Sequence, residues 1–350
     1  MRDAPFHTQG ARHAKNVSRP TNLHTFYPYT LSQALLQIFS HLPNTVTSVH
    51  CQLCPKLGFW LPVTGYGSLK MVSERELFLF DLHGYLKIPN FLTETEVKAL
   101  NEAFDTNWDH RVDDPNHHPD GNLHGPVRRG MFTGMLTWDK PHCQPFRDLL
   151  VHRKVISYLD AFLGRGWKMD HSPFMLTGGK GTEGLRIHGS TSHHFHGAQY
   201  HTYSNGMIRC GMIVCQYQLA DVNEGDGGLC VVPGSHKANF KAPEEILLWK
   251  SDPEVVYNVP GKAGDLVIFN EATLHGTLPW TADHERRSLL YRYSPKYLHY
   301  AGGSYETSQP DWVSELTEAQ QAVLEPPYIY HRPLVEPDGQ SVVKPRRDMP

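Results

Sequence analysis

The residues best suited to chemistry lie between Gly227 and Arg287. His275 follows the apolar run DLVIF at the end of an expected strand, and Arg286 and Arg287 come eleven and twelve residues later. An imidazole can bind a divalent metal ion, and the planar guanidinium of an arginine can hold a carboxylate through two hydrogen bonds. This stretch therefore predicts a metal centre beside a binding site for a small dicarboxylate.

Four segments, in this order, resemble the phytanoyl-CoA dioxygenase family of Fe(II)- and 2-oxoglutarate-dependent oxygenases. They are SERELFLFDLHGYLKIPNFLTETEVKAL, the PGSHK turn, KAGDLVIF, and His275 with its downstream arginine, and the resemblance extends from about Val72 to about Pro295. It implies a 2-oxoglutarate-dependent dioxygenase that binds Fe(II) and 2-oxoglutarate and uses O2. The implied reaction is hydroxylation of a small organic substrate, with release of succinate and CO2.

The resemblance also implies that two histidines and one carboxylate hold the iron, the first two ligands being written His-x-Asp or His-x-Glu. His188 fits the first histidine best, because a glycine-bounded strand precedes it and the PGSHK turn follows it, and His275 is the second. Ser190 stands where the carboxylate is expected. The same loop contains further histidines at His193, His194, His196 and His201. Of these, His196 and His201 could each replace His188 as the first ligand, whereas the HHFH run is expected to be a solvated loop.

Three explanations remain for the third iron position. Glu271 could supply the ligand, but residues four apart on an extended strand are roughly 13 Å apart, so Glu271 is expected to contact the substrate or a ligand unless the segment bends. A halide could occupy the position instead, as in iron and 2-oxoglutarate halogenases of similar fold, or the Ser190 hydroxyl could bind a water ligand. The third explanation is loss of catalysis, which would leave a cupin-like binding protein.

Arg286 and Arg287 are expected to face opposite sides, because neighbouring residues of a strand alternate. The resemblance favours Arg286 as the residue that binds the distal carboxylate of 2-oxoglutarate, and Thr277 as a hydroxyl donor to the same carboxylate. Arg287 is the second candidate for this role. Gln216, Tyr217 and Gln218 could line the pocket, although alternate residues of this strand must point away, and Trp280 is expected to cap the pocket.

Composition excludes several classes of partner. The chain has 350 residues and a formal net charge of −3, which gives no electrostatic footprint for nucleic acid. No apolar run approaches the ~20 residues that a membrane helix needs, and six cysteines are too few for a disulfide scaffold. We therefore expect a small-molecule substrate, no nucleic acid, no membrane insertion and a cytoplasmic location. The basic N-terminal segment makes a mitochondrial location the alternative. The pair Cys51 and Cys54 is expected to be incidental rather than a metal site. No feature of the sequence indicates an oligomeric state.

Three parts are expected along the chain. They are a partly disordered N-terminal extension over residues 1–70, a dioxygenase-like domain over 71–325, and a Pro-rich tail over 326–350. After Lys168 the chain becomes a series of short β-like runs, among them PFMLTGG, GLRIHGS, GMIVCQYQLADV, DLVIFNEATLH and RSLLYRYSP. Such spacing predicts a mostly β fold with flanking helices, an α+β arrangement around a double-stranded β-helix of the jelly-roll or cupin-like kind.

Helices are expected mainly before this β-rich region. Ser73 with Glu76, and Thr93 with Glu96, have the spelling of helix-capping boxes, and the strand GYLKIPNFL lies between the two helices that they begin. Another helix is predicted over residues 145–163 from its apolar spacing. These helices are expected to cover one face of a sheet.

Overall fold

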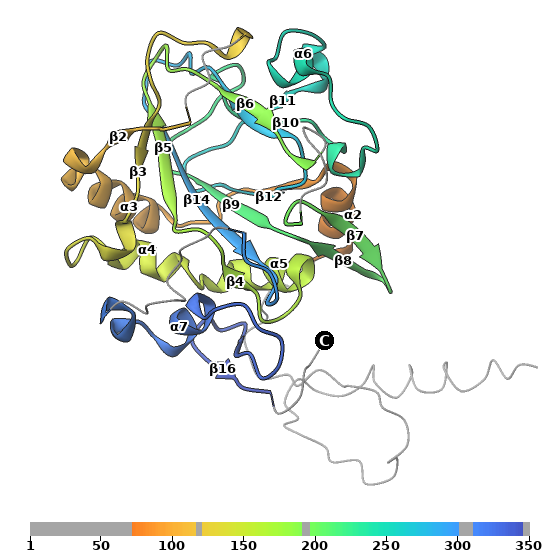
Figure 1. The fold of residues 1–350 in the computed structure, drawn as a ribbon. Helices are drawn as coiled ribbons and strands as arrows, with labels where there is room; N and C mark the ends of the chain where they lie inside the picture. The colour runs from red at the N-terminus through yellow and green to blue at the C-terminus, as the bar shows by residue number, and fades with distance from the viewer. Residues whose placement is uncertain (1–71, 117–120, 191–196, 301–310, 346–350) are drawn as a thin grey trace, which may run out of the picture. The chain divides into compact units, whose positions relative to one another are not determined.

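The computed structural model describes residues 72–116, 121–190, 197–300 and 311–345 (Figure 1). The expected N-terminal extension, the pair Cys51 and Cys54, and the HHFH run at residues 193–196 lie outside the described residues. None of the described helices is long and apolar enough to cross a membrane.

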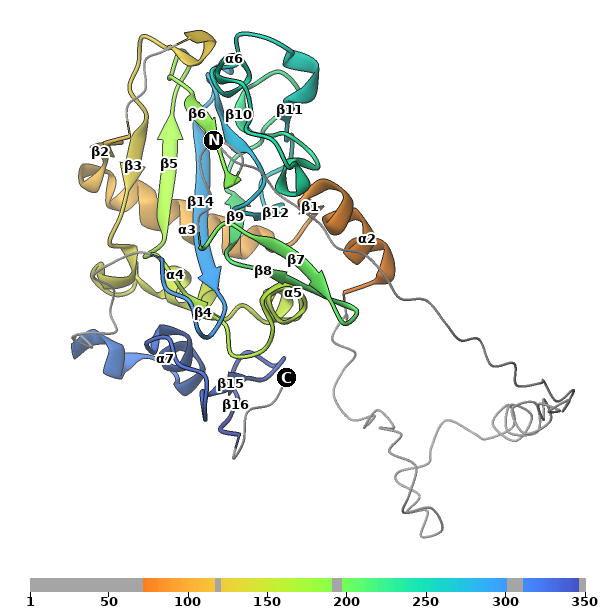
Figure 2. The same ribbon diagram turned by 45° about the vertical axis from the view of Figure 1, so that its right-hand side comes forward.

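Two antiparallel sheets face each other, as Figures 1 and 2 show. Their strands are β1 (Tyr85–Ile88), β2 (Val112–Asp113), β3 (Gly130–Phe132), β4 (Lys168–Met169), β5 (Phe174–Gly178), β6 (Leu185–His188), β9 (Ile213–Gln218), β10 (Gly228–Val231), β11 (Tyr257–Asn258), β12 (Leu266–Asn270), β13 (His275–Leu278) and β14 (Arg286–Ser294). The larger sheet has the order β1-β12-β9-β14-β5-β3-β2, with β4 beside β14, and the smaller has the order β11-β10-β13-β6. The expected jelly-roll fold is confirmed.

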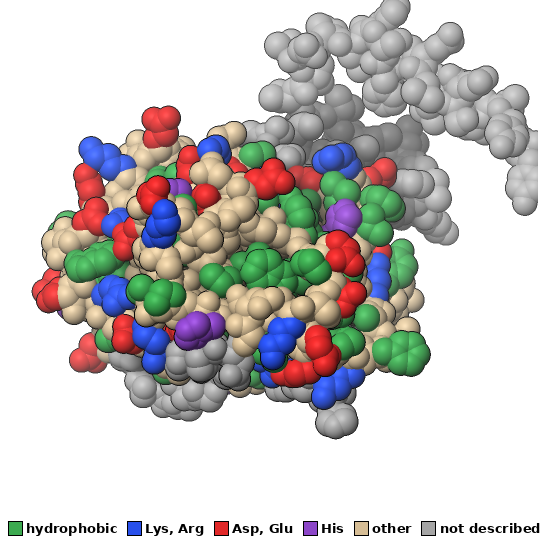
Figure 3. Space-filling view, turned by 90° about the horizontal axis from the view of Figure 1, so that it is seen from above, with side chains coloured by type: hydrophobic (Ala, Val, Ile, Leu, Met, Phe, Trp, Pro, Cys, Tyr) green, Lys and Arg blue, Asp and Glu red, His purple; other side chains and the backbone are tan. Residues whose placement is uncertain are grey.

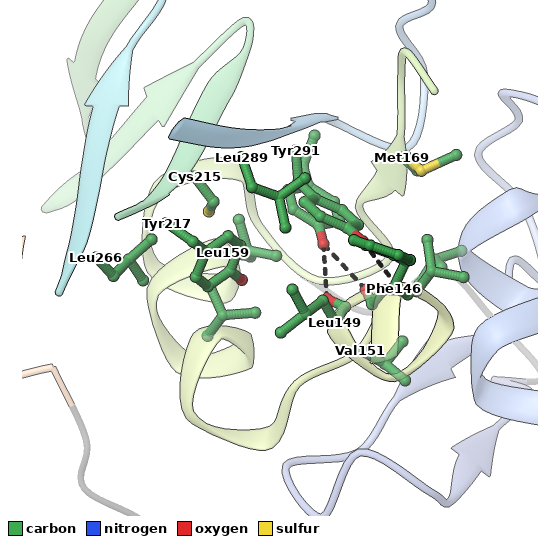
Figure 4. Packing of buried hydrophobic residues seen from close by; sticks show 14 of the residues in the cluster. Phe146, Leu149, Val151, Leu159, Met169, Cys215, Tyr217, Leu266, Leu289 and Tyr291 are labelled. Carbon is green, nitrogen blue, oxygen red and sulfur yellow. Dashed lines mark hydrogen bonds between the residues drawn. The ribbon is translucent and has the colours of Figure 1, made fainter. Parts of the chain in front are cut away.

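Side chains of the larger sheet alternate between two cores. In β9, Val214 belongs to the apolar cluster between the sheets, whereas Cys215 and Tyr217 pack on the other face against the helices. Figure 4 shows Cys215 and Tyr217 beside Leu159 of a covering helix. A strand that is buried on both faces in this way reads as a nearly continuous apolar run, which is the pattern of GMIVCQYQL.

The helices of the described residues are α2 (Glu74–His83), α3 (Glu94–Thr106), α4 (Gln144–Leu149), α5 (Arg153–Leu163), α6 (Glu244–Leu247) and α7 (Glu318–Leu324). Helices α3, α4 and α5 cover the outer face of the larger sheet, as expected, whereas α6 lies beside the smaller sheet (Figure 1). The two predicted capping boxes are present, because Ser73 and Thr93 each accept a hydrogen bond from the backbone of the glutamate three residues later. Such caps stabilise a helix start by about 1 kcal/mol.

The prediction of one helix over residues 145–163 is wrong, since the chain forms α4 and α5 with a break between them. Two tyrosines of β14 account for the end of α4. Tyr291 donates its hydroxyl hydrogen to the carbonyl oxygen of Phe146 at 2.7 Å, and Tyr293 is within 3.2 Å of the carbonyl oxygens of Leu149 and Leu150. These buried hydroxyls satisfy carbonyl groups that a helix would leave free where it ends (Figure 4).

Two further hairpins lie outside the two main sheets. β7 (His201–Ser204) pairs with β8 (Met207–Cys210), and Figure 2 shows this hairpin beside α5. β15 (Leu334–Val335) pairs with β16 (Val342–Val343), so the segment expected to be a Pro-rich tail is folded as far as Pro345. Arg332 anchors it, because its buried guanidinium donates to the carbonyl oxygen of Gly166 at 2.6 Å. Acidic and basic side chains are mixed over the face that Figure 3 shows, in keeping with the near-neutral composition.

Candidate active site

His188 and His275 face each other across two strands of the smaller sheet. His188 ends β6, His275 begins β13, and the two are directly opposite partners in the antiparallel pairing. Directly opposite residues bring their side chains together, and the centroids of the two imidazole rings are 4.3 Å apart. The structure thus brings the two predicted histidines to one place.

Both imidazoles are held in the tautomer that a metal ligand needs. His188 Nδ1 is 2.9 Å from the carbonyl oxygen of Arg186, and His275 Nδ1 is 2.7 Å from that of Thr273. Because a carbonyl oxygen can only accept, each Nδ1 carries the proton and each Nε2 keeps its electron pair. Burial, followed by the neighbouring His275, lowers the pKa of His188 to about 4, so this imidazole is neutral at neutral pH.

Glu271 lies beside the histidines because the chain turns after β12. Asn270 holds this turn: its side-chain oxygen accepts a hydrogen bond from the Ala272 N–H at 2.9 Å, and its carbonyl oxygen accepts one from the Thr273 N–H at 2.8 Å. Glu271 Oε1 is 3.7 Å from His275 Nε2. The expectation of an extended strand between Glu271 and His275 is wrong, because DLVIFNEATLH forms two strands that belong to different sheets.

Ser190, which stands where the carboxylate was expected, ties β6 to this turn. Its Oγ donates to the carbonyl oxygen of Ala272 at 3.0 Å, and its backbone N–H donates to the same oxygen at 3.2 Å. Gly189 permits the close approach, since a Cβ at this position would lie 2.7 Å from the carbonyl oxygen of Thr273. The Ser190 hydroxyl is therefore directed at the backbone of the turn that carries Glu271.

His188, Glu271 and His275 form a cluster that could hold a metal ion, with candidate ligand atoms all within 4.8 Å of one another. Burial acts to raise the pKa of Glu271, but His275 and Arg292 outweigh it and leave the pKa below its usual range. Its Oε2 is buried and has no hydrogen-bond partner among the described residues. A charged, buried oxygen of this kind suits a bound cation, and two imidazoles with one carboxylate are the donor set of non-haem Fe(II) sites.

The cluster lies in the wall of a cavity of about 520 Å³ that both sheets line. Phe174, Leu176 and Leu290 of the larger sheet give it apolar walls, and Gln216 of β9 adds a buried amide. This size and mixture are typical of sites for small organic molecules.

Arg286 lines the same cavity and is a buried cation. Its Nε donates to Ser288 Oγ at 3.2 Å, and in the described part of the chain no carboxylate forms an ion pair with it. Burial, followed by the charge of Arg129, lowers the pKa of Arg286 to about 9. Thr277, also buried, lines the cavity as well. A buried guanidinium without an acidic partner, with a hydroxyl in the same cavity, is suited to an incoming carboxylate.

Arg287 points the other way, as strand alternation requires. Its guanidinium pairs with Asp105 at 2.6 Å and Glu285 at 2.9 Å, and it donates to Asn101 Oδ1 at 3.0 Å. Arg287 therefore belongs to an ion-pair network with α3, and only Arg286 of the two lines the cavity.

The remaining expected pocket residues have mixed outcomes. Gln216 lines the cavity, but Tyr217 packs in the core on the helix side and Gln218 accepts a hydrogen bond from Ser288 Oγ. The expectation that Trp280 caps the pocket is wrong, because its indole is buried and donates to the carbonyl oxygen of His284. Arg292 lines the cavity and was not predicted from the sequence, although its even spacing from Arg286 on one strand placed both on one face.

His201, a candidate for the first ligand, lies elsewhere. Its Nε2 is 3.0 Å from Asp81 Oδ1, and its Nδ1 is 3.1 Å from the side-chain nitrogen of Asn270. It lines a larger cavity of about 1040 Å³ beside α2, α5 and the β7–β8 hairpin, which contains none of the clustered ligands. His193, His194 and His196 lie outside the described residues.

One protein family matches the chain over the region that contains the cluster. The family model described as phytanoyl-CoA dioxygenase (PhyH) matches residues 80–288, which is more than half of the chain. The chain belongs to the phytanoyl-CoA dioxygenase family. It is therefore a 2-oxoglutarate-dependent dioxygenase whose cofactors are Fe(II), 2-oxoglutarate and O2. No curated protein matches the sequence.

Solved structures resemble this phytanoyl-CoA dioxygenase family member in fold. HygX from Streptomyces hygroscopicus with nickel and 2-oxoglutarate bound has 22% identity and a TM-score of 0.54, covering 68% of this chain and 93% of HygX. The complex that also contains hygromycin B has 23% identity, the same coverage and a TM-score of 0.54. HygX with iron bound has 20% identity and a TM-score of 0.52, covering 69% of this chain and 94% of HygX.

Proposed function

We propose that the protein hydroxylates a small organic molecule, with His188, Glu271 and His275 as the ligands of Fe(II). The observation that carries this proposal is the approach of three ligand atoms to within 4.8 Å in the wall of a cavity that Arg286 also lines, a cation with no ion-pair partner among the described residues. Glu271 thus replaces the carboxylate that the family usually carries two residues after the first histidine. When bound, Fe(II) with 2-oxoglutarate supplies the activation of O2.

The residues of this chain bind and orient the reactants. Arg286 is assigned to the distal carboxylate of 2-oxoglutarate through two hydrogen bonds, and Thr277 adds a hydroxyl to the same carboxylate. Both imidazoles are pre-oriented by their Nδ1 hydrogen bonds to the backbone, which keeps their Nε2 atoms available. The apolar wall of Phe174 and Leu290 excludes water and holds a C–H bond of the substrate near the metal.

The overall reaction balances without another reductant. Substrate C–H, O2 and 2-oxoglutarate give the alcohol, succinate and CO2, one oxygen atom entering each of the alcohol and succinate. The complex of HygX with 2-oxoglutarate and hygromycin B supports a site of this fold that takes a cosubstrate and a small molecule together.

Halogenation is less well supported than hydroxylation for a specific reason. A halide needs a coordination position that no carboxylate takes, and here Glu271 Oε1 is 3.7 Å from His275 Nε2. The Ser190 hydroxyl donates its hydrogen to the carbonyl oxygen of Ala272, so it could meet a water ligand only as an acceptor. Hydroxylation therefore accounts for the ligand cluster better than chlorination does.

Metal binding and product analysis test the proposal. Anaerobic titration should show that wild-type protein binds one Fe(II), while His275→Ala and Glu271→Gln lose at least about tenfold in affinity. His124→Ala, which removes an exposed histidine, is the matched control and should bind Fe(II) as wild type does.

Product analysis separates the reaction types. Incubation with Fe(II), 2-oxoglutarate, chloride and a mixture of small metabolites should give succinate and a product that has gained one oxygen atom by mass spectrometry. A product that has gained chlorine would favour the halogenase. Retention of Fe(II) affinity in Glu271→Gln would exclude Glu271 as a ligand.

A further inference from the structure

Arg292 lies in the proposed active site, where it is neither one of the proposed metal ligands nor the arginine assigned to the cosubstrate. It follows Arg286 by six residues on β14, and both line the cavity. Six residues of extended strand separate their Cα atoms by about 20 Å, which puts the two guanidinium groups toward opposite ends of the cavity. Because Arg286 is assigned to 2-oxoglutarate, Arg292 lies at the end that remains for the substrate.

Its neighbours fix the guanidinium and leave one edge open. Arg292 Nε is 3.7 Å from Glu271 Oε2, and the central guanidinium carbon is 4.7 Å from the centroid of the Phe174 ring. The Arg292 side chain is 16% exposed to solvent. No described residue forms a hydrogen bond with its two terminal nitrogens. That edge offers two parallel N–H donors, the geometry that matches a planar carboxylate.

Other charges in the cavity wall are already matched. Asp114 Oδ2 is 2.9 Å from Arg129 Nη2, and Arg186 Nη2 is 2.5 Å from Glu244 Oε2. In the loaded site the charges of the divalent metal and the 2-oxoglutarate dianion cancel, and Glu271 offsets one of the two positive charges of Arg286 and Arg292. One net positive charge then remains in a largely apolar cavity, where an unmatched charge is unfavourable. Glu271 lies against Nε of Arg292, so the terminal edge of this guanidinium is left to meet a substrate anion.

We propose that the substrate carries a carboxylate, and that Arg292 binds it at the end of the cavity opposite to 2-oxoglutarate. This inference rests on the proposed function. A single carboxylate matches the one positive charge, whereas a phosphate dianion would leave an excess of negative charge. The apolar residues Phe174, Leu176 and Leu290 line the cavity between the two arginines and suit the hydrocarbon part of such an acid, so the carboxylate fixes which C–H bond lies near the metal.

Paired probes test this directly. The full-length protein is first loaded with Zn(II), which prevents turnover, and saturated with 2-oxoglutarate. Small aliphatic and aromatic carboxylic acids are then titrated by calorimetry, each beside its primary amide. In wild type we expect at least one acid to bind about tenfold more tightly than its amide. The ratio of acid affinity to amide affinity should fall below about threefold in Arg292→Met and be partly retained in Arg292→Lys. Arg287→Met, on the opposite face of the same strand, should keep it in full.

Each outcome is decisive. Wild-type protein that binds Zn(II) and 2-oxoglutarate yet prefers no acid over its amide overturns this inference alone. So does an acid preference that persists in Arg292→Met, since another cation such as Arg186 would then be responsible. Wild-type protein that binds neither Zn(II) nor 2-oxoglutarate overturns the proposed function, and this inference with it.

Discussion

Replacement of Arg286 by methionine should weaken 2-oxoglutarate binding and stabilise the protein without its cosubstrate. Burial, aided by Arg129, lowers the pKa of Arg286 from 12.5 to about 9, and each pKa unit corresponds to ~1.4 kcal/mol. The charged side chain is therefore destabilised by about 5 kcal/mol in the folded protein, as an order of magnitude. Because the folded-state pKa is the lower one, this destabilisation is fully present below pH ~9 and disappears only as the pH rises toward the unfolded value.

A carboxylate that binds Arg286 offsets this unfavourable burial. Arg286→Met should therefore lose about 3–5 kcal/mol of 2-oxoglutarate affinity, or roughly 200- to 4,000-fold. The same variant without 2-oxoglutarate should unfold at a higher temperature than wild type at pH 7.5. Calorimetric titration of the Zn(II)-loaded protein and thermal unfolding of the unloaded protein measure the two effects.

Arg287→Met is the matched control for this experiment. It removes the ion pairs with Asp105 and Glu285, so it should lower the free energy of unfolding by about 1 kcal/mol and leave 2-oxoglutarate affinity unchanged. An Arg286→Met affinity within about tenfold of wild type would refute the assignment of the cosubstrate carboxylate to Arg286.

Two further predictions concern the turn and the partly buried Asp160. Ser190→Ala removes the hydroxyl that holds the carbonyl oxygen of Ala272. Fe(II) affinity should then fall by a factor of about ten, the smallest effect expected for residues that position ligands. Equal Fe(II) titration curves for the variant and the wild type would contradict this prediction. Burial raises the pKa of Asp160 to about 6 despite the hydrogen bond from Trp167. Ionisation of this carboxyl therefore lowers the free energy of unfolding, and the loss develops as the pH rises from about 4 through 6. Asp160→Asn, which keeps an acceptor for Trp167, should raise the free energy of unfolding by up to about 3 kcal/mol at pH 7.5 and by nearly nothing at pH 4. Thermal unfolding at both pH values checks this, and an equal gain at pH 4 would show that charge is not the cause.

Local signals in the sequence predicted much of the fold. The capping boxes at Ser73 and Thr93 need only residues three positions apart, and the strands around His188 and His275 are bounded by glycine, proline and asparagine. Pairing of the two histidines followed from the order of the strands in a jelly roll. These features depend on short-range chemistry or on the family resemblance, so one sequence sufficed.

The position of Glu271 could not be predicted in this way. An extended chain along DLVIFNEATLH would separate Glu271 from His275, whereas the observed turn brings them together. Distant segments help to hold this turn. Asn270 donates its N–H to the carbonyl oxygen of Gly84 at 2.9 Å, and Glu271 donates its N–H to the carbonyl oxygen of Met212 at 3.1 Å. One local signal did exist. Asparagine at a strand end readily forms a turn through its own side chain, and Asn270 does this here.

Two other elements differ from the sequence prediction for different reasons. The end of α4 depends on tyrosine hydroxyls from β14, which lies more than a hundred residues away in sequence, so no local pattern announces it. The β7–β8 hairpin, in contrast, does have a local signal. Asn205 and Gly206 both have positive φ, 52° and 77°, and Asn-Gly between two strand-like runs is a strong hairpin signal.

The turn at Asn270 makes the proposed iron site a crosslink between the two layers of the sandwich. Glu271 directly follows β12 of the larger sheet, whereas His188 and His275 belong to the smaller one. A metal held by all three would fasten the sheets at the wall of the cavity, much as a disulfide joins distant segments, and would stabilise the folded state more strongly as its affinity or its concentration rises. Loss of iron would then loosen this part of the wall first, so backbone amides of β6 and β13 should exchange hydrogen faster while those of β9 and β14 stay protected.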